Sequence, residues 1–355
     1  AVHLGNPDSF LHKLSTLKEL TAEGKMPFSP KDLETMLQLI NLYYESPRKD
    51  EESYEKNVQA LRTQFKALEE YPQIVLQKAL IKTAYPEYKR YLGLPTETDF
   101  ETMNLNRMYE IFKERFTDAS NQIFFFVGNI SDEDIKLIAK YLNNLPVTNK
   151  QKNEKNKDVY PVLAPDVNRT EVFKGKENMS IVIMLGETEG FDATLRNRCM
   201  VDMLGECLQI STTEIIREKM GDAYSPASDV SYVLEPIPAV SWTFQIQCDP
   251  KKVEKVEKAV LKIMQMYVKK GPDAETLKKA KEQMIKSREV QLQENSTWMN
   301  MIYGAYFYNE NRDERITKYN DWVNSITIEE IKELAKKYFD FSHYCVTILK
   351  PEKNK

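Results

Sequence analysis

An internal repeat constrains this chain more than any other feature of its sequence. Pro30 opens an amphipathic helical run, and Pro250 opens a matching run 220 residues later. In each copy there follow a second Pro-containing turn, a long charged helix, a variable helical stretch and a final amphipathic helix. At Phe116 and Phe339, which end those final helices, the offset has grown only to 223 residues. So many matches in the same order indicate a duplicated structural unit.

Each copy closes on a β-like apolar run. After the final helices, predicted over residues 105–116 and 328–339, come residues 122–127 (QIFFFV) and 344–349 (YCVTIL). Runs of this length that are rich in β-branched and aromatic residues predict strands. We therefore expect a strand at the end of each copy.

The second copy has a front part that the first lacks. Residues 179–186 (MSIVIMLG) form an apolar run of strand length, and residues 194–208 have helical periodicity. Two further strands are predicted over residues 224–234 and 239–248, and apolar and polar residues alternate strictly in the second of them. Such alternation is typical of a sheet with one buried face. Counting back 220 residues from residues 179–208 of this front part leads to positions before residue 1, so we expect the chain to begin in the middle of a repeat.

These patterns predict an α+β fold made of two related units. Residues 1–145 are expected to be the second part of a first unit that is truncated at its N-terminus. Residues 146–167 include a stretch rich in Asn, Lys and Gln without apolar periodicity, which predicts a polar linker. Residues 168–355 are expected to form a complete second unit.

Composition excludes several classes of protein. Apolar residues make up 41% of the 355 residues, enough for a buried core, and no apolar run reaches the length of a membrane span. Lys and Arg number 50 against 54 Asp and Glu, spread evenly, whereas a nucleic-acid-binding protein shows a basic face or tail. There is no glycine-rich phosphate loop. We therefore expect neither nucleic acid nor a membrane among the partners.

The few histidines limit the catalytic schemes open to this chain. His3, His12 and His343 are its only histidines, and none has a second His or a carboxylate at a metal-ligand spacing. Cys199 and Cys207 are eight residues apart on a predicted helix, about 12 Å along its axis, which is too far for a disulfide. We predict no metal site in this chain. A Ser/His/Asp or Cys/His arrangement that forms only in space stays open.

One short segment is unusual. Residues 213–225 predict a short helix, a stop at Gly221 and the start of a strand. This places Arg217 and Tyr224 seven residues apart, on either side of one tight turn. Arg offers a planar fork of donors and Tyr a phenolic donor, so together they can hold two successive carbonyls of an extended peptide or stabilise a developing oxyanion. On spacing alone, a surface Arg and a Tyr on the sheet surface are the simpler interpretation.

This segment, residues 216–225 (IREKMGDAYS), resembles the signature LREExGxxYSV in the C-terminal half of the pitrilysin/insulinase family of zinc metallopeptidases. Other family patterns resembled here are residues 125–129 (FFVGN), 271–281 (GPDAETLKKAK) and 347–352 (TILKPE). Residues 46–52 (SPRKDEE) and 294–298 (ENSTW) suggest the PqqL-like bacterial branch. The resemblance extends over nearly the whole chain.

The resemblance implies four similar α/β rolls, arranged as two halves that close on a peptide. The first half of the family carries an inverted zinc motif, His-x-x-Glu-His, with a distal Glu ligand, and no such motif occurs here. This chain therefore resembles the second half, as two related α/β rolls of which the first is truncated. The zinc is expected in the missing N-terminal half, which is a partner in the same polypeptide or in a separate subunit.

The resemblance also gives roles to two residues. Arg217 and Tyr224 match, in type and spacing, a pair that binds substrate carbonyls and supports the tetrahedral intermediate, so they are expected to be auxiliary catalytic and substrate-binding residues. Pro226 departs from the family, which often has Val there, and we expect it to bend the start of the strand. The implied function is the substrate-binding half of a zinc endopeptidase that acts on peptides or unfolded proteins and is inactive alone.

Two other functions stay open. Some relatives of this fold are structural members of larger complexes, so the chain is alternatively a non-catalytic scaffold or partner subunit. It is also conceivable as a peptide-binding module that captures extended chains along a sheet edge. The retained Arg217 and Tyr224 favour the peptidase half, because a scaffold has no need of them. Analogy with bacterial relatives favours the periplasm, whereas substrate identity, cleavage preference and oligomeric state are not encoded in any recognisable pattern.

Overall fold

The computed structural model describes residues 32–88, 95–148, 160–221 and 223–352. The chain divides into two compact units: unit 1 comprises Ala1–Glu52 and Asn104–Glu154, and unit 2 comprises Ser53–Met103 and Lys155–Lys355. The roll boundaries expected at residues 145 and 168 stay a prediction. His3, His12, Pro30 and residues 149–159 of the expected linker lie outside the described residues.

The described part of unit 1 is helical. Its elements are α2 (Asp32–Glu45), α6 (Leu105–Phe116), the 3-10 turn η1 (Ala119–Asn121) and α7 (Asp132–Leu142). Helices α2 and α7 pack together: the Tyr141 hydroxyl donates to the Glu34 carboxylate at 2.8 Å, and the Asn41 side chain donates to the Tyr141 carbonyl at 3.2 Å. The helices predicted after Pro30 and over residues 105–116 are confirmed as α2 and α6.

The apolar run at residues 122–127 is not a strand, contrary to the prediction. All strands of the described residues belong to one sheet, and none of them pairs with this run. Instead, Phe124 packs against Tyr44, with ring centroids 6.4 Å apart. A strand needs a neighbour for its backbone N–H and C=O groups, and apolar composition cannot replace that neighbour.

Unit 2 is built around a five-stranded sheet with strand order β1-β5-β2-β4-β3. Its strands are β1 (Val167–Phe173), β2 (Ser180–Glu189), β3 (Ala227–Val233), β4 (Ala239–Cys248) and β5 (Tyr344–Lys350). The pairs β2–β4, β2–β5 and β3–β4 are antiparallel, and β1–β5 is parallel. The strands predicted over residues 179–186, 239–248 and 344–349 are thus confirmed.

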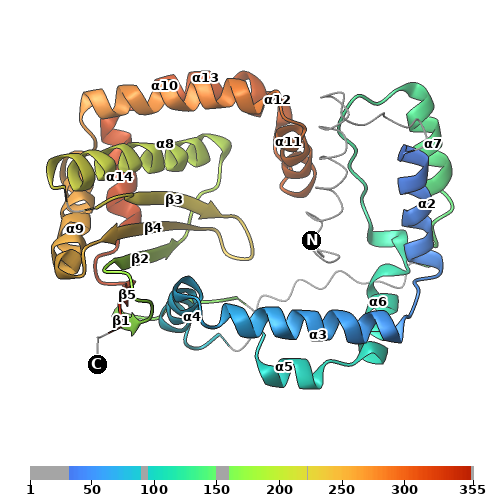
Figure 1. Cartoon of the computed structure of the whole chain (residues 1–355). Helices are drawn as coiled ribbons and strands as arrows, with labels where there is room; N and C mark the ends of the chain where they lie inside the picture. The colour runs from blue at the N-terminus through green and yellow to red at the C-terminus, as the bar shows by residue number, and fades with distance from the viewer. Residues whose placement is uncertain (1–31, 89–94, 149–159, 222, 353–355) are drawn as a thin grey trace, which may run out of the picture. The chain divides into compact units, whose positions relative to one another are not determined.

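Three helices cover one face of this sheet (Figure 1). The helices of the second copy are α8 (Leu195–Thr212), α9 (Val253–Lys270), α10 (Ala274–Gln291), α11 (Asn295–Phe307), α12 (Arg312–Thr317), α13 (Tyr319–Ser325) and α14 (Ile328–Tyr338), with the short turn η4 (Pro250–Lys252) before α9. Helices α8, α9 and α14 bury their apolar sides against β2 and β4. The alternation along β4 explains why, because its Trp242, Phe244 and Ile246 are all fully buried on that face.

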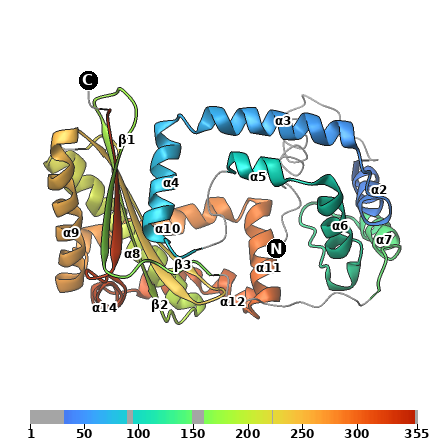
Figure 2. The ribbon, with the colours of Figure 1, turned by 90° about the horizontal axis from the view of Figure 1, so that it is seen from below.

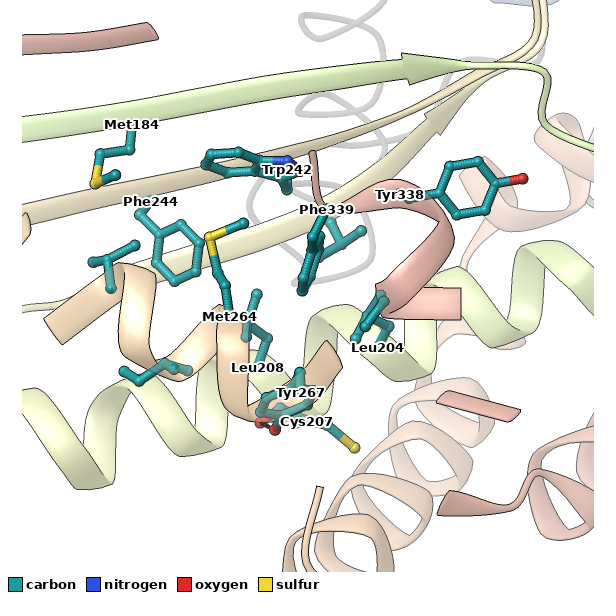
Figure 3. Close-up of a cluster of buried hydrophobic side chains, with 14 of the residues drawn as sticks. Met184, Leu204, Cys207, Leu208, Trp242, Phe244, Met264, Tyr267, Tyr338 and Phe339 are labelled. Atoms are coloured by element: carbon teal, nitrogen blue, oxygen red, sulfur yellow. Dashed lines mark hydrogen bonds between the residues drawn. The ribbon is translucent and has the colours of Figure 1, made fainter. Parts of the chain in front are cut away.

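The centre of the core lies between β4 and helix α8. Figure 3 shows Trp242 and Phe244 of the sheet above Leu204 and Leu208 of α8, with Met264 of α9 between them. Gly186 on β2 makes room for this packing, because a Cβ there would meet the Trp242 ring at 2.4 Å. Burial of this many large apolar side chains supplies most of the stability of unit 2.

The opposite face is covered at β1 and β5 by a helix from earlier in the chain (Figure 2). This helix is α4 (Pro72–Ala84), and unit 2 also contains α5 (Glu97–Thr102) and most of α3 (Glu51–Leu68). Leu76 of α4 packs on Ile181, and the Ala164 amide donates to the Ala84 carbonyl at 2.7 Å. No helix of the described residues is long and apolar enough to cross a membrane.

Candidate functional site

Helix α8 continues directly into a π-helix, η3 (Thr213–Lys219), which carries Arg217. The wider turn ends where the Met220 amide donates to the Ile215 carbonyl, five residues back, at 3.1 Å. Ile216 is fully buried in the core, and Arg217, the next residue, is exposed. The π-helix is thus anchored through one residue and presents the following one to solvent.

A turn at Gly221 returns the chain from η3 to the sheet. Gly221 has a φ of 60°, in the left-handed region that glycine adopts without strain. Beyond it, Ala223 forms an isolated antiparallel bridge with Cys248, and the Tyr224 amide donates to the Gln247 carbonyl at 3.2 Å. The backbone of Tyr224 is therefore tied to the end of β4, while its side chain is 76% exposed.

One extra residue separates this bridge from strand β3. The four-residue step from Ala223 to Ala227 faces a three-residue step from Cys248 to Gln245. An extra residue of this kind bends a strand and redirects its side chains, and such bulges are frequent beside active sites. Pro226 lies in the step, and β3 begins only at the residue after it, three residues later than predicted.

The Gln209 side chain of α8 forms hydrogen bonds on both sides of this turn. This residue was not identified from the sequence. Its side-chain nitrogen donates to the Pro226 carbonyl at 3.2 Å and to the Thr213 hydroxyl at 3.0 Å. Its side-chain oxygen accepts a hydrogen bond from the Ser228 amide at 2.6 Å. One amide therefore links the end of α8 to the start of β3. Its partners on the strand side, Pro226 and Ser228, are 17 and 19 residues away in the sequence, and no local pattern marks them.

The polar ends of both predicted residues meet solvent. Within the described part of the chain, neither the Arg217 guanidinium nor the Tyr224 hydroxyl forms a hydrogen bond or ion pair. The neighbouring Lys219 is already paired with Glu214 at 2.7 Å. The structure places the two residues on opposite sides of one turn, as the spacing predicts, and leaves their donors available to a ligand. Their role in binding substrate stays a prediction.

The described residues do not fit a zinc site. They contain no group of three or more His, Cys, Asp or Glu side chains that could hold a metal ion. His343 lies beside the Leu163 carbonyl, with its Nε2 3.3 Å away. All four cysteines are free and buried, and burial raises the pKa of the Cys199 thiol to about 12, so it is protonated and inert at neutral pH.

A family model described as the Peptidase M16 inactive domain matches residues 102–284, which is more than half of the chain. The chain belongs to the M16 peptidase family. The M16 match includes Arg217 and Tyr224. M16 is the pitrilysin/insulinase family, so the resemblance expected from the sequence, to the C-terminal half, is confirmed.

One curated protein and two solved structures are similar to about nine-tenths of this chain. The chain is 23% identical over 327 residues to the probable zinc protease PqqL of Haemophilus influenzae. This alignment covers 90% of this chain and 34% of that protein. A protease from Helicobacter pylori shares the fold with a TM-score of 0.74 and 16% identity, over 91% of this chain and 78% of the other. The periplasmic protease PqqL from Escherichia coli shares it with a TM-score of 0.67 and 17% identity, over 91% and 35%.

These similarities establish the fold of the chain but cover only part of the PqqL proteins. At such identities the structural matches establish the fold, so the expected class of mixed helices and sheet is confirmed. The chain spans about a third of the length of the PqqL proteins that it matches.

Proposed function

We propose that this chain is the C-terminal, substrate-binding half of a zinc-dependent endopeptidase, which closes on a peptide against a zinc-bearing N-terminal half. The observation that carries the proposal is the turn between η3 and β3 in an M16 inactive domain, where Arg217 and Tyr224 are exposed and bond to no side chain of the described residues. The lack of a metal-holding group among the described residues agrees with a partner half that holds the zinc.

The two side chains suit the binding of peptide carbonyls. The guanidinium has a fixed fork of donors, and the phenol adds one donor on a rigid ring, so both can donate to successive carbonyl oxygens of an extended peptide. A donor aimed at the oxygen that becomes negative lowers the barrier more than it strengthens substrate binding. The zinc of the other half would supply the activated water, and this chain would bind and orient the peptide.

The first experiment is reconstitution with the zinc-bearing half, followed by the cleavage of an unfolded protein. We expect the 355-residue chain alone to be inactive and to raise the turnover of the zinc half. Arg217→Ala and Tyr224→Phe should lose most of that increase, whereas the control Tyr71→Phe, at another exposed tyrosine, should retain it. An increase that both site variants retain would contradict the site.

The same experiment separates the alternatives. Assembly with the zinc half without any effect on turnover would favour a scaffold subunit. Binding of an unfolded peptide by the isolated chain, lost in Arg217→Ala, would favour a peptide-binding module. Immunoblotting of native extract would show whether the zinc half belongs to the same polypeptide, through a band at more than twice 41.5 kDa. We further propose the periplasm as the compartment, as for the Escherichia coli protein, and cell fractionation tests it.

A further inference from the structure

Unit 2 contains a polar cavity that the proposed peptidase function does not use. Its volume is about 420 Å³, within the range of small-molecule sites. It lies beside helix α8, and its walls include residues of β3, α10 and α13 as well. The charged and aromatic side chains that matter here are Arg198, Asp202, Glu206, Tyr232, Arg288 and Tyr319.

Two of the arginines at this cavity already form ion pairs, and they share one carboxylate. The Glu310 carboxylate, which is almost fully buried, pairs with Arg198 and, at 2.8 Å, with Arg315. Gly304 leaves the space for this triad, because a Cβ there would lie 2.5 Å from a Glu310 oxygen. Both arginines are therefore held by the same carboxylate, and the triad keeps one net positive charge.

Arg288 is the cation of the cavity wall that has no carboxylate partner. It is only 9% exposed, and its guanidinium lies over the Tyr319 ring, 4.9 Å from the centroid. Its Nη2 donates to the Arg315 carbonyl at 3.2 Å, its Nε has no hydrogen-bond partner, and no described Asp or Glu pairs with it. A buried guanidinium without a counter-ion is costly, which marks this wall as a place for an anionic group.

Two carboxylates in the same cavity form no direct ion pair with the described residues. Asp202 and Glu206 are four residues apart on α8, so their side chains share one face of the helix. Neither forms a hydrogen bond or ion pair with another described residue. Water reaches Asp202, but partial desolvation by the cavity walls raises its pKa to about 6, and burial also raises the pKa of Glu206. Arg198 and Arg315 act on Asp202 only through space, so neither carboxylate has a direct ion pair among the described residues.

We infer that this cavity binds a small zwitterion, with an ammonium group at Asp202 and Glu206 and a carboxylate at Arg288. Free amino acids and dipeptides both have this chemistry. Each end of such a ligand would form a direct ion pair with side chains that form none among the described residues, and the rings of Tyr232 and Tyr319 offer apolar surface between them. A metal ion does not suit the site, because the described residues provide no group of three ligands. The proposal is independent of Arg217 and Tyr224.

Calorimetric titration of the 355-residue chain with phenylalanine and with the dipeptide Ala-Phe tests the inference. N-acetyl-Ala-Phe lacks the ammonium group, and Ala-Phe amide lacks the carboxylate. We expect binding of at least one of the two zwitterions and affinity at least about tenfold lower for each blocked form of the dipeptide. If phenylalanine binds more tightly, the ligand is a free amino acid, and if Ala-Phe binds more tightly, it is a dipeptide. If neither binds up to about 10 mM, or if free and blocked forms bind equally, the inference is wrong.

Substitutions assign the two ends of the ligand. Arg288→Gln should remove the preference for free Ala-Phe over its amide, and Asp202→Asn should reduce the preference over the acetylated form. Arg312→Gln, an exposed arginine away from the cavity, is the control and should bind like the wild type. If circular dichroism shows that Arg288→Gln is unfolded, the half-exposed Glu206→Gln decides the case. It should weaken Ala-Phe but not N-acetyl-Ala-Phe, and an unchanged affinity for both would overturn the assignment.

Discussion

Helix α8 and its extension η3 carry charged side chains at two ends, in opposite surroundings. At the cavity end, Arg198 is buried and pairs with the buried Glu310. At the other end, Arg217 is exposed and pairs with no described residue. One continuous helix therefore holds an arginine that belongs to the folded core and an arginine that faces solvent.

The difference is one of solvation. A charge removed from water must recover its hydration from a protein partner, so the loss of that partner destabilises the fold. An exposed charge keeps its hydration, and its removal changes little unless a ligand is present. We therefore expect substitutions at the cavity end to change the free energy of unfolding and substitutions at the turn to change turnover.

The largest effect is expected at Glu310. Replacement by Ala leaves the buried Arg198 and the partly exposed Arg315 without the carboxylate that they share, which should lower the free energy of unfolding by about 3–5 kcal/mol. Urea titration measures this change. The control is Glu282→Ala, at a carboxylate of α10 that is 67% exposed, which should have little effect. Equal stability of the two variants would mean that the triad is not desolvated.

Gln209 should come next, because it connects α8 to the turn. Gln209→Ala removes the hydrogen bonds to the Pro226 carbonyl and the Ser228 amide, so we expect a loss of about 1–2 kcal/mol. The exposed control Gln59→Ala should be neutral. Hydrogen exchange locates the effect: faster exchange of the Ser228 amide is expected, and unchanged exchange there would show that Gln209 does not hold the turn.

A smaller effect, with a defined pH dependence, is expected at Asp202. Its pKa is raised to about 6, chiefly by burial, with Asp229 adding to the rise and Arg315 and Arg198 opposing it. The folded state then holds a proton between about pH 4 and 6 that the unfolded state has released, so stability rises as the pH falls through this window. Asp202→Asn should abolish this increment and stabilise the protein at pH 7 by about 1 kcal/mol, since water in the cavity screens the charge.

Chemical denaturation of Asp202→Asn and the wild type at pH 4, 5, 6 and 7 measures this difference. The comparison isolates Asp202 from other carboxylates, which titrate equally in both proteins. A constant difference across the four pH values would show that Asp202 has the same pKa in the folded and unfolded states.

Elements that bury one face locally were predictable from the sequence. The strict alternation around Trp242 and Phe244 predicted β4 to the residue, and the apolar spacing after Pro250 predicted α9. These patterns suffice because each element needs only a surface to cover. Residues 122–127 have an equally apolar sequence but form no strand, because a strand depends on a partner that composition does not reveal.

The turn after η3 and the cavity beside α8 also differ in how far they could be predicted from the sequence. Arg217, Gly221 and Tyr224 lie within eight residues of one another, so a short motif contains their arrangement. The cavity joins Asp202 to Arg288, and the triad joins Arg198 to a glutamate 112 residues away. Pairs so distant in the sequence leave no periodic signal, and only the folded chain brings them together.

The smallest effect on stability is expected at the turn itself. Tyr224→Phe removes one exposed hydroxyl, and Arg217→Ala one exposed guanidinium, so the unfolding midpoint in urea should match that of the wild type for both. In the assembled peptidase, however, Tyr224→Phe should raise the barrier by about 2–4 kcal/mol if the phenol stabilises the oxyanion, a loss of about 30- to 1,000-fold in kcat with little change in KM. Steady-state kinetics of the reconstituted enzyme separates the two constants. A loss confined to KM would make Tyr224 a substrate-binding residue without a role in the transition state, and a loss of stability would place it in the core with Arg198.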